Sequence, residues 1–151
     1  MKNYHRLFLI PCSLILCLAI LAGFSPSSAA EDEPLEYLLE RRTKIIQNAI
    51  YGNISKNEAE IMLREVETVP LLKKDIKSLY QWDSTRMDIV KKGRIIEKTE
   101  TAQIYDYISY RILVRWEMAG AQGDYSQTQE YHMVIKKMGM EYRMSDFTPI
   151  D

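Results

Sequence analysis

The chain has 151 residues, with 20 basic and 21 acidic side chains, two histidines and two cysteines. This length is enough for one domain with a hydrophobic core of its own. The near-neutral charge gives no reason to expect nucleic acid or an anionic membrane surface as a partner.

The first thirty residues have the three parts of a secretory signal peptide. Lys2 and Arg6 form a basic start, and an apolar stretch follows over residues 7–24. Ser28 and Ala30 then occupy the small-residue positions of a cleavage site. We therefore expect cleavage near Ala30 and a secreted or extracytoplasmic protein.

The alternative is an uncleaved membrane anchor, since 18 apolar residues are close to the minimum of about 17 for a membrane span. Pro26 and the absence of a following basic cluster favour cleavage. Cleavage leaves one domain, residues 31–151, and removes both Cys12 and Cys17. That domain carries 18 basic and 21 acidic side chains, a net charge of −3.

Three helices are predicted in the first half of this domain. The first runs from about Pro34, in its first turn and capped by Asp32 or Glu33, to Tyr51. Its apolar stripe consists of Leu35, Leu38, Leu39, Ile45, Ile46, Ala49 and Ile50. Ser55 and Glu58 predict a capping box at the start of the second helix. Pro70 separates it from a third, which ends near Trp82.

After Trp82 the apolar residues alternate, as in strands. A strand is predicted over residues 87–91, with a hairpin turn at Lys92-Gly93. Ile95 and Ile96 belong to the return strand, where two adjoining apolar residues indicate a bulge. The clearest strand has an inward face of Ile108, Tyr110, Ile112, Val114, Trp116 and Met118.

Two more strands complete the pattern. Residues 119–124 are predicted to form a loop, because they are small, polar and include two glycines. A strand over residues 126–136 then points Tyr131, Met133 and Ile135 inward. After a turn at residues 137–139, the last strand, residues 141–147, faces inward through Tyr142 and Met144.

The predicted fold class is α+β, with N-terminal helices packed on a curved antiparallel sheet of about four strands. The ending Glu141-Tyr142-Arg143-Met144-Ser145-Asp146-Phe147 resembles the last strand of secreted members of the NTF2-like (cystatin-like) superfamily. The resemblance implies a first helix in the concave face of the sheet, with a pocket beside it. Members of that superfamily include enzymes, binders and interaction modules, so the resemblance does not settle function.

His132 is the single histidine of residues 31–151. A catalytic base needs an orienting acid and a pocket, and the nearest acids by sequence are Asp106 and Glu130. Because His132 alternates with Tyr131 and Met133, we expect it to point away from the core. An exposed structural histidine is therefore favoured, and the inward positions of the sheet carry phenols and no charge.

His132, Met133 and Met144 also resemble the first half of a copper-chaperone pattern, since imidazole and thioether ligands suit Cu(I). The second half, a later His-x-Met, is missing. Methionine as core filler is favoured, so we expect no metal site and no cofactor.

Four aromatic residues are the candidate ligand-binding set. Tyr110, Trp116, Tyr131 and Tyr142 could line a pocket for an apolar ligand, although such rings equally suit an ordinary core. We expect the space between helix and sheet to be filled, with any cleft near Tyr110 and Tyr131.

Together these observations predict a non-enzymatic extracytoplasmic binding or interaction domain, whose partner is a protein or a small apolar ligand. One alternative is an enzyme or carrier for a small apolar ligand, and a second is a copper-handling protein. A membrane contact is expected only through an uncleaved N-terminal segment.

Overall fold

The computed structural model describes residues 29–81 and 88–151. Its contacts divide the chain into two units, Met1–Asp32 and Glu33–Asp151, and the fold below is that of the second unit. Residues 1–28 of the predicted export segment, Trp82 and the expected strand start at Met87 lie outside the described residues. None of the helices among the described residues is both long and apolar enough to cross a membrane.

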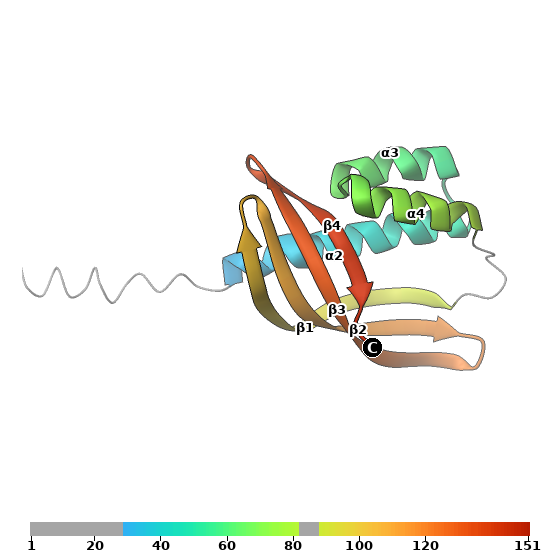
Figure 1. The fold of residues 1–151 in the computed structure, drawn as a ribbon. Helices are drawn as coiled ribbons and strands as arrows, with labels where there is room; N and C mark the ends of the chain where they lie inside the picture. The colour runs from blue at the N-terminus through green and yellow to red at the C-terminus, as the bar shows by residue number, and fades with distance from the viewer. Residues whose placement is uncertain (1–28, 82–87) are drawn as a thin grey trace, which may run out of the picture. The chain divides into compact units, whose positions relative to one another are not determined.

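Within the described residues, three helices precede four strands, which confirms the α+β class (Figure 1). The helices are α2 (Ala29–Ile50), α3 (Lys56–Val66) and α4 (Val69–Gln81). The strands form one antiparallel sheet in chain order: β1 (Ile89–Ile104), β2 (Tyr107–Gly120), β3 (Gly123–Met138) and β4 (Glu141–Pro149).

The helix boundaries follow local chemistry, with one correction. Helix α2 begins at Ala29 rather than near Pro34, so Pro34 lies inside it and neither Asp32 nor Glu33 caps it. The predicted capping box of α3 is confirmed: the Glu58 amide donates to the Ser55 hydroxyl at 3.1 Å, and the Ser55 amide donates to the Glu58 carboxylate at 3.4 Å.

Pro70 lies in the first turn of α4 rather than between the helices. A proline is tolerated there because the first turn of a helix leaves its backbone N–H groups unpaired. The two helices are separated instead by Glu67 and Thr68, where the Thr68 amide donates a hydrogen bond to the Met144 carbonyl of β4. This bond ties the helical layer to the last strand.

The predicted hairpin turn at Lys92-Gly93 is wrong. Strand β1 continues through Gly93, which pairs with Trp116 of β2. The chain reverses at Tyr105 and Asp106 instead, where Tyr105 takes a positive φ of 53°. A glycine is needed at position 93 because the Trp116 ring packs closely against the backbone there, and not because the chain turns.

The predicted bulge in β1 is confirmed by a register shift between Ile95 and Glu97. Residues 119–124, expected to be a loop, are mostly strand: Ala119 pairs with Asp124 and Gly120 with Gly123. Only residues 121–122 form the turn, because paired glycines at the strand ends allow a tight reversal.

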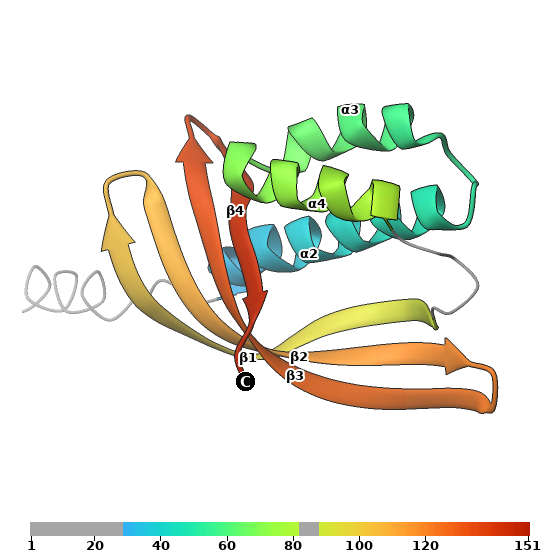
Figure 2. The ribbon, with the colours of Figure 1, turned by 45° about the vertical axis from the view of Figure 1, so that its right-hand side comes forward.

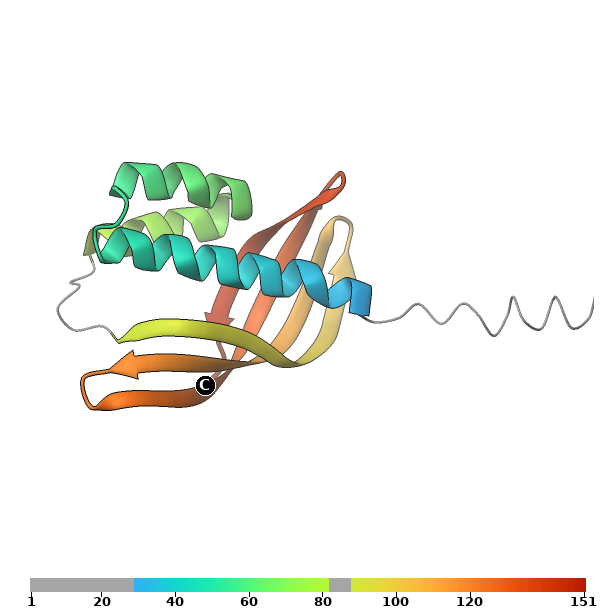
Figure 3. The ribbon, with the colours of Figure 1, turned by 180° about the vertical axis from the view of Figure 1, so that it is seen from behind.

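The core lies between the helices and the inner face of the sheet. The sheet bends midway along β1, β2 and β3 (Figure 2), and α2 crosses its inner face lengthwise (Figure 3). The predicted inward positions of β2 are buried from Tyr110 to Met118, and Ile108 is partly buried, whereas Arg111, Arg115 and Glu117 face water. The most completely buried side chains include Leu35, Leu39, Leu63, Leu71, Ile112, Met133 and Met144.

Candidate functional site

A cleft lies between α2 and the inner face of the sheet, with a volume of about 230 Å³. That is room for roughly eight waters. Helix α2 contributes one stripe at four-residue spacing, Arg42, Ile46 and Ile50. The strands contribute the opposite wall through Val90, Trp116, Met118, Gln127, Tyr131 and Phe147.

The cleft results from the unequal lengths of the strands. Strands β2 and β3 pair as far as Gly120 and Gly123, whereas β4 pairs with β3 only over residues 131–138. Helices α3 and α4 pack against β4. Among the described residues, no residue of α3 or α4 lines the cleft, and Figure 2 shows both helices on the side of α2 that faces away from the long ends of β1, β2 and β3. A straight helix cannot follow a bent sheet along its whole length, and space remains.

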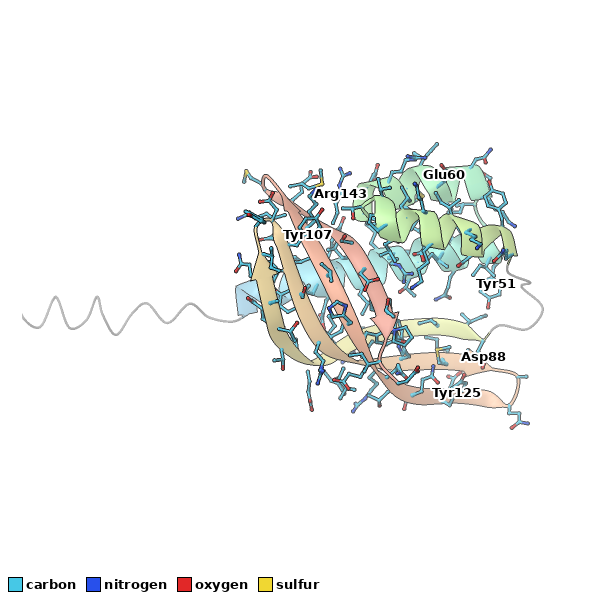
Figure 4. The ribbon with its side chains drawn as sticks, in the orientation of Figure 1. Tyr51, Glu60, Asp88, Tyr107, Tyr125 and Arg143 are labelled. Atoms are coloured by element: carbon cyan, nitrogen blue, oxygen red, sulfur yellow. The ribbon has the colours of Figure 1, made fainter. Side chains whose placement is uncertain are left out.

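The mouth of the cleft is polar. Asp88, just before β1, accepts a hydrogen bond of 2.6 Å from the Tyr125 hydroxyl, and Tyr51 follows the end of α2. Figure 4 shows Tyr51 and Asp88 at the same end of the domain, with Tyr125 beside Asp88. Gln47 donates to the Val90 carbonyl at 2.9 Å and so bridges α2 to β1 near this opening.

The inner wall of the cleft is formed by three aromatic rings in contact, with the Arg42 guanidinium against the last of them. The Trp116 indole N–H donates to the Tyr131 hydroxyl at 3.0 Å, and the two rings meet edge to face. Tyr131 stacks on Phe147 with ring centroids 4.3 Å apart, and the Arg42 guanidinium carbon lies 5.1 Å from the Phe147 centroid. Offset and edge-on ring pairs of this kind, together with a cation over a ring, fix the wall in one arrangement.

Arg42 is held by two buried carboxyl groups. Its Nε lies 3.1 Å from Glu67 Oε1, and its Nη2 lies 2.5 Å from Asp75 Oδ2. Glu67 follows α3 and Asp75 lies on α4, so this cluster joins all three helices. Burial and the neighbouring Asp75 carboxyl raise the pKa of Glu67 to about 9, against the opposing effect of Arg42.

Sequence reasoning missed this cluster. The buried carboxyl groups are Glu67, just after α3, and Asp75, on α4, so this charge comes from the helical layer. A signal was present: Arg42 falls in the gap of the α2 stripe between Leu39 and Ile45, and Asp75 lies at helical spacing between Leu71 and Leu79. A charged residue inside an apolar stripe indicates a buried partner, because an unpaired buried charge is too costly.

The four aromatic residues predicted as a set are only partly together. Trp116 and Tyr131 meet in the wall of the cleft. Tyr110 is buried in the core opposite Met133, away from the cleft. Tyr142 borders a separate depression with Tyr37 and other residues at the start of α2. The cleft therefore lies at Trp116 and Tyr131 rather than at Tyr110 and Tyr131, and the space there is open rather than filled.

The three copper-ligand candidates do not converge. His132 lies on the outer face of β3, as expected, with 44% of its side chain exposed. Met133 and Met144 are completely buried on the inner face. Adjacent residues of a strand point to opposite faces, so His132 and Met133 cannot bind one ion.

The acid nearest to His132 is neither Asp106 nor Glu130, which corrects the expectation. Its Nδ1 lies 3.2 Å from Asp146 Oδ2 on the neighbouring strand β4. Glu130 lies 3.4 Å from Arg111 Nε instead. Cross-strand neighbours are set by sheet register, which the sequence did not reveal.

No known protein family and no curated protein sequence matches this chain. Among solved structures, it is similar to the intermembrane space region of the chloroplast protein ARC6. The two are 12% identical, the match covers 79% of this chain and 95% of that chain, and the TM-score is 0.48. The resemblance to the NTF2-like (cystatin-like) superfamily stays a prediction.

Proposed function

We propose that this chain is a binding domain without catalytic activity, and that the cleft between α2 and the sheet holds a small, mainly apolar ligand. The observation that carries the proposal is the open space beside Trp116 and Tyr131. Its walls are largely aliphatic and aromatic, with a few polar groups at one end and at the mouth. This composition is typical of small-molecule sites.

Binding is favoured over catalysis by the chemistry of the polar groups. Arg42 is the charged side chain at the inner end of the cleft, and a guanidinium does not serve as a general base near neutral pH. Asp88 lies exposed at the mouth and accepts from Tyr125. The rival enzyme function would need a nucleophile or a proton-transfer group inside the cleft, and His132 lies on the opposite face of the sheet.

We also propose that the domain acts outside the cytoplasm and is NTF2-like. The basic start, the apolar stretch and the small-residue site at Ala30 support export. Helices that precede an antiparallel sheet, with the first helix on its inner face, support the superfamily proposal. The copper-handling alternative is disfavoured by the opposite faces of His132 and Met133.

The test uses two neutral apolar probes, toluene and heptan-1-ol, with methyl NMR on the full chain. Binding should shift the methyl signals of Ile50 and Met118, which line the cleft, and not those of Ile61, which is exposed on α3. Ile50→Trp should fill the cleft and abolish the shifts. Ile61→Trp, which adds the same bulk elsewhere, should leave them unchanged. Absence of any shift at Ile50 and Met118 in the unmodified protein would overturn the proposal.

A further inference from the structure

The inner end of the cleft offers hydrogen-bond donors. The Arg42 guanidinium uses Nε and Nη2 for Glu67 and Asp75, and within residues 29–81 and 88–151 no hydrogen bond is made by Nη1. Guanidinium nitrogens only donate. Because Arg42 lines the cleft, this nitrogen is a donor available to a bound molecule.

Tyr131 supplies a second donor. Its hydroxyl oxygen already accepts a hydrogen bond from the Trp116 indole, and the hydroxyl can still donate its own proton to a bound molecule. Burial raises the pKa of Tyr131, which keeps that proton in place. Arg42 and Tyr131 both line the cleft and both contact the ring of Phe147, and the Arg42 charge acts on the Tyr131 hydroxyl, so the two donors lie in the same part of the cleft.

The remaining lining is mainly apolar. It includes the aliphatic or thioether side chains of Ile46, Ile50, Val90 and Met118, and also three neutral polar residues, Thr43, Gln47 and Gln127. The acid that borders the cleft, Asp88, lies at its exposed mouth. A ligand that fills the site thus meets charged and hydroxyl donors at one end and a mainly apolar, uncharged surface along its body.

We propose that the ligand is a small apolar monocarboxylic acid, with its carboxylate at Arg42 and Tyr131 and its hydrocarbon body between α2 and the sheet. This inference rests on the function proposed above and names the class of ligand for the same cleft. A carboxylate has two acceptor oxygens, one for each donor, and a charge-assisted hydrogen bond is stronger than a neutral one. Arg42 already faces Asp75, and its five N–H groups are enough for two carboxylates on different edges.

The first experiment compares three probes of one length by isothermal titration with the full chain at neutral pH: heptanoate, heptan-1-ol and heptan-1-amine. We expect heptanoate to bind at least tenfold more tightly than the other two. Equal or tighter binding of the alcohol or the amine overturns the carboxylate assignment but leaves the apolar cleft standing. Failure of all three probes to bind overturns both proposals.

The second experiment assigns the head group to its residues. Tyr131→Phe keeps the ring stack and removes one donor, so it should weaken heptanoate several-fold. Arg42→Lys should weaken heptanoate at least tenfold and heptan-1-ol by less than twofold. Arg41→Lys, one residue away and outside the cleft, is the matched control and should change neither value.

A parallel loss of heptanoate and heptan-1-ol binding in Arg42→Lys would assign Arg42 a structural role and overturn the inference. Since Arg42 also pairs with the buried Asp75 carboxyl group and contacts Glu67, this variant has to be checked for a cooperative thermal transition. If it does not fold, Tyr131→Phe and the probe series decide: unchanged heptanoate affinity in Tyr131→Phe, or no preference for the acid, rejects the inference.

Discussion

The six-membered ring of Trp116 lies directly against the backbone of Gly93 on the neighbouring strand. A Cβ atom added at Gly93 would lie 2.5 Å from Cζ3 and 2.9 Å from Cε3 of that ring. The two residues are register partners of β1 and β2. Glycine inside a strand normally weakens it, and here it leaves the room that the indole needs to form the wall of the cleft.

Gly93→Ala should therefore destabilise the protein, although alanine is otherwise the better strand residue. We expect a loss of about 1–3 kcal/mol in the free energy of unfolding, typical of an overpacked site, measured by urea denaturation. The control is a double-mutant cycle. In a Trp116→Ala background the added methyl group meets no ring, so the cost of Gly93→Ala should largely vanish. Equal costs in both backgrounds would show that the ring is not the obstacle.

Trp116 itself should contribute far more to stability than its neighbour on the same strand. Trp116 is buried and bonded to Tyr131, whereas Arg115 faces water. Trp116→Ala should cost about 3–5 kcal/mol, and Arg115→Ala less than about 0.5 kcal/mol. Similar losses at the two positions in denaturant melts would contradict the assignment of the strand faces.

The sequence pattern predicted those features of the fold that depend on a single helix or strand. The alternation of β2 indicated which residues are buried, and Ser55 with Glu58 indicated where α3 begins, because both signals are local. The Lys92-Gly93 turn was wrong because glycine has two uses, reversal and close approach, and only the position of Trp116 distinguishes them.

The site could be predicted only in part for the same reason. Trp116 and Tyr131 were expected on one inner face, but which rings share a cleft depends on where β4 stops and α2 diverges. Pairing between Arg42 and Asp75 spans separate helices, and no spacing rule within either helix places them together. The charge in each apolar stripe indicated a buried partner without indicating which one.

Export makes a prediction that is independent of the fold. N-terminal sequencing of the protein from its producing cell should begin at or near Glu31, because the small-residue site ends at Ala30. The cleaved protein holds no cysteine, so its melting temperature should not change with reductant. A retained Met1 with membrane association would instead support the uncleaved anchor.

The buried carboxyl of Glu67 should make stability fall as pH rises. Burial and the Asp75 carboxyl raise the pKa of Glu67 from its ordinary value of 4.5 to about 9. Between these values the folded protein holds a proton at Glu67 that the unfolded chain has lost. Folding then takes up a proton, so the free energy of unfolding decreases with pH, by at most about 1.4 kcal/mol per pH unit for one group.

Glu67→Gln removes this titration while keeping a polar side chain of similar shape. Its stability, relative to the unmodified protein, should rise steadily from pH 5 to pH 9 in urea melts at constant ionic strength. Comparing the two proteins isolates Glu67, because the other titrating groups are common to both. Glu65→Gln is the matched control, since Glu65 is exposed on α3 and pairs with Arg41 at the surface. Its profile should run parallel to that of the unmodified protein; if the Glu67→Gln profile is also parallel, Glu67 is ionised in the folded state, and the Arg42 charge outweighs its burial.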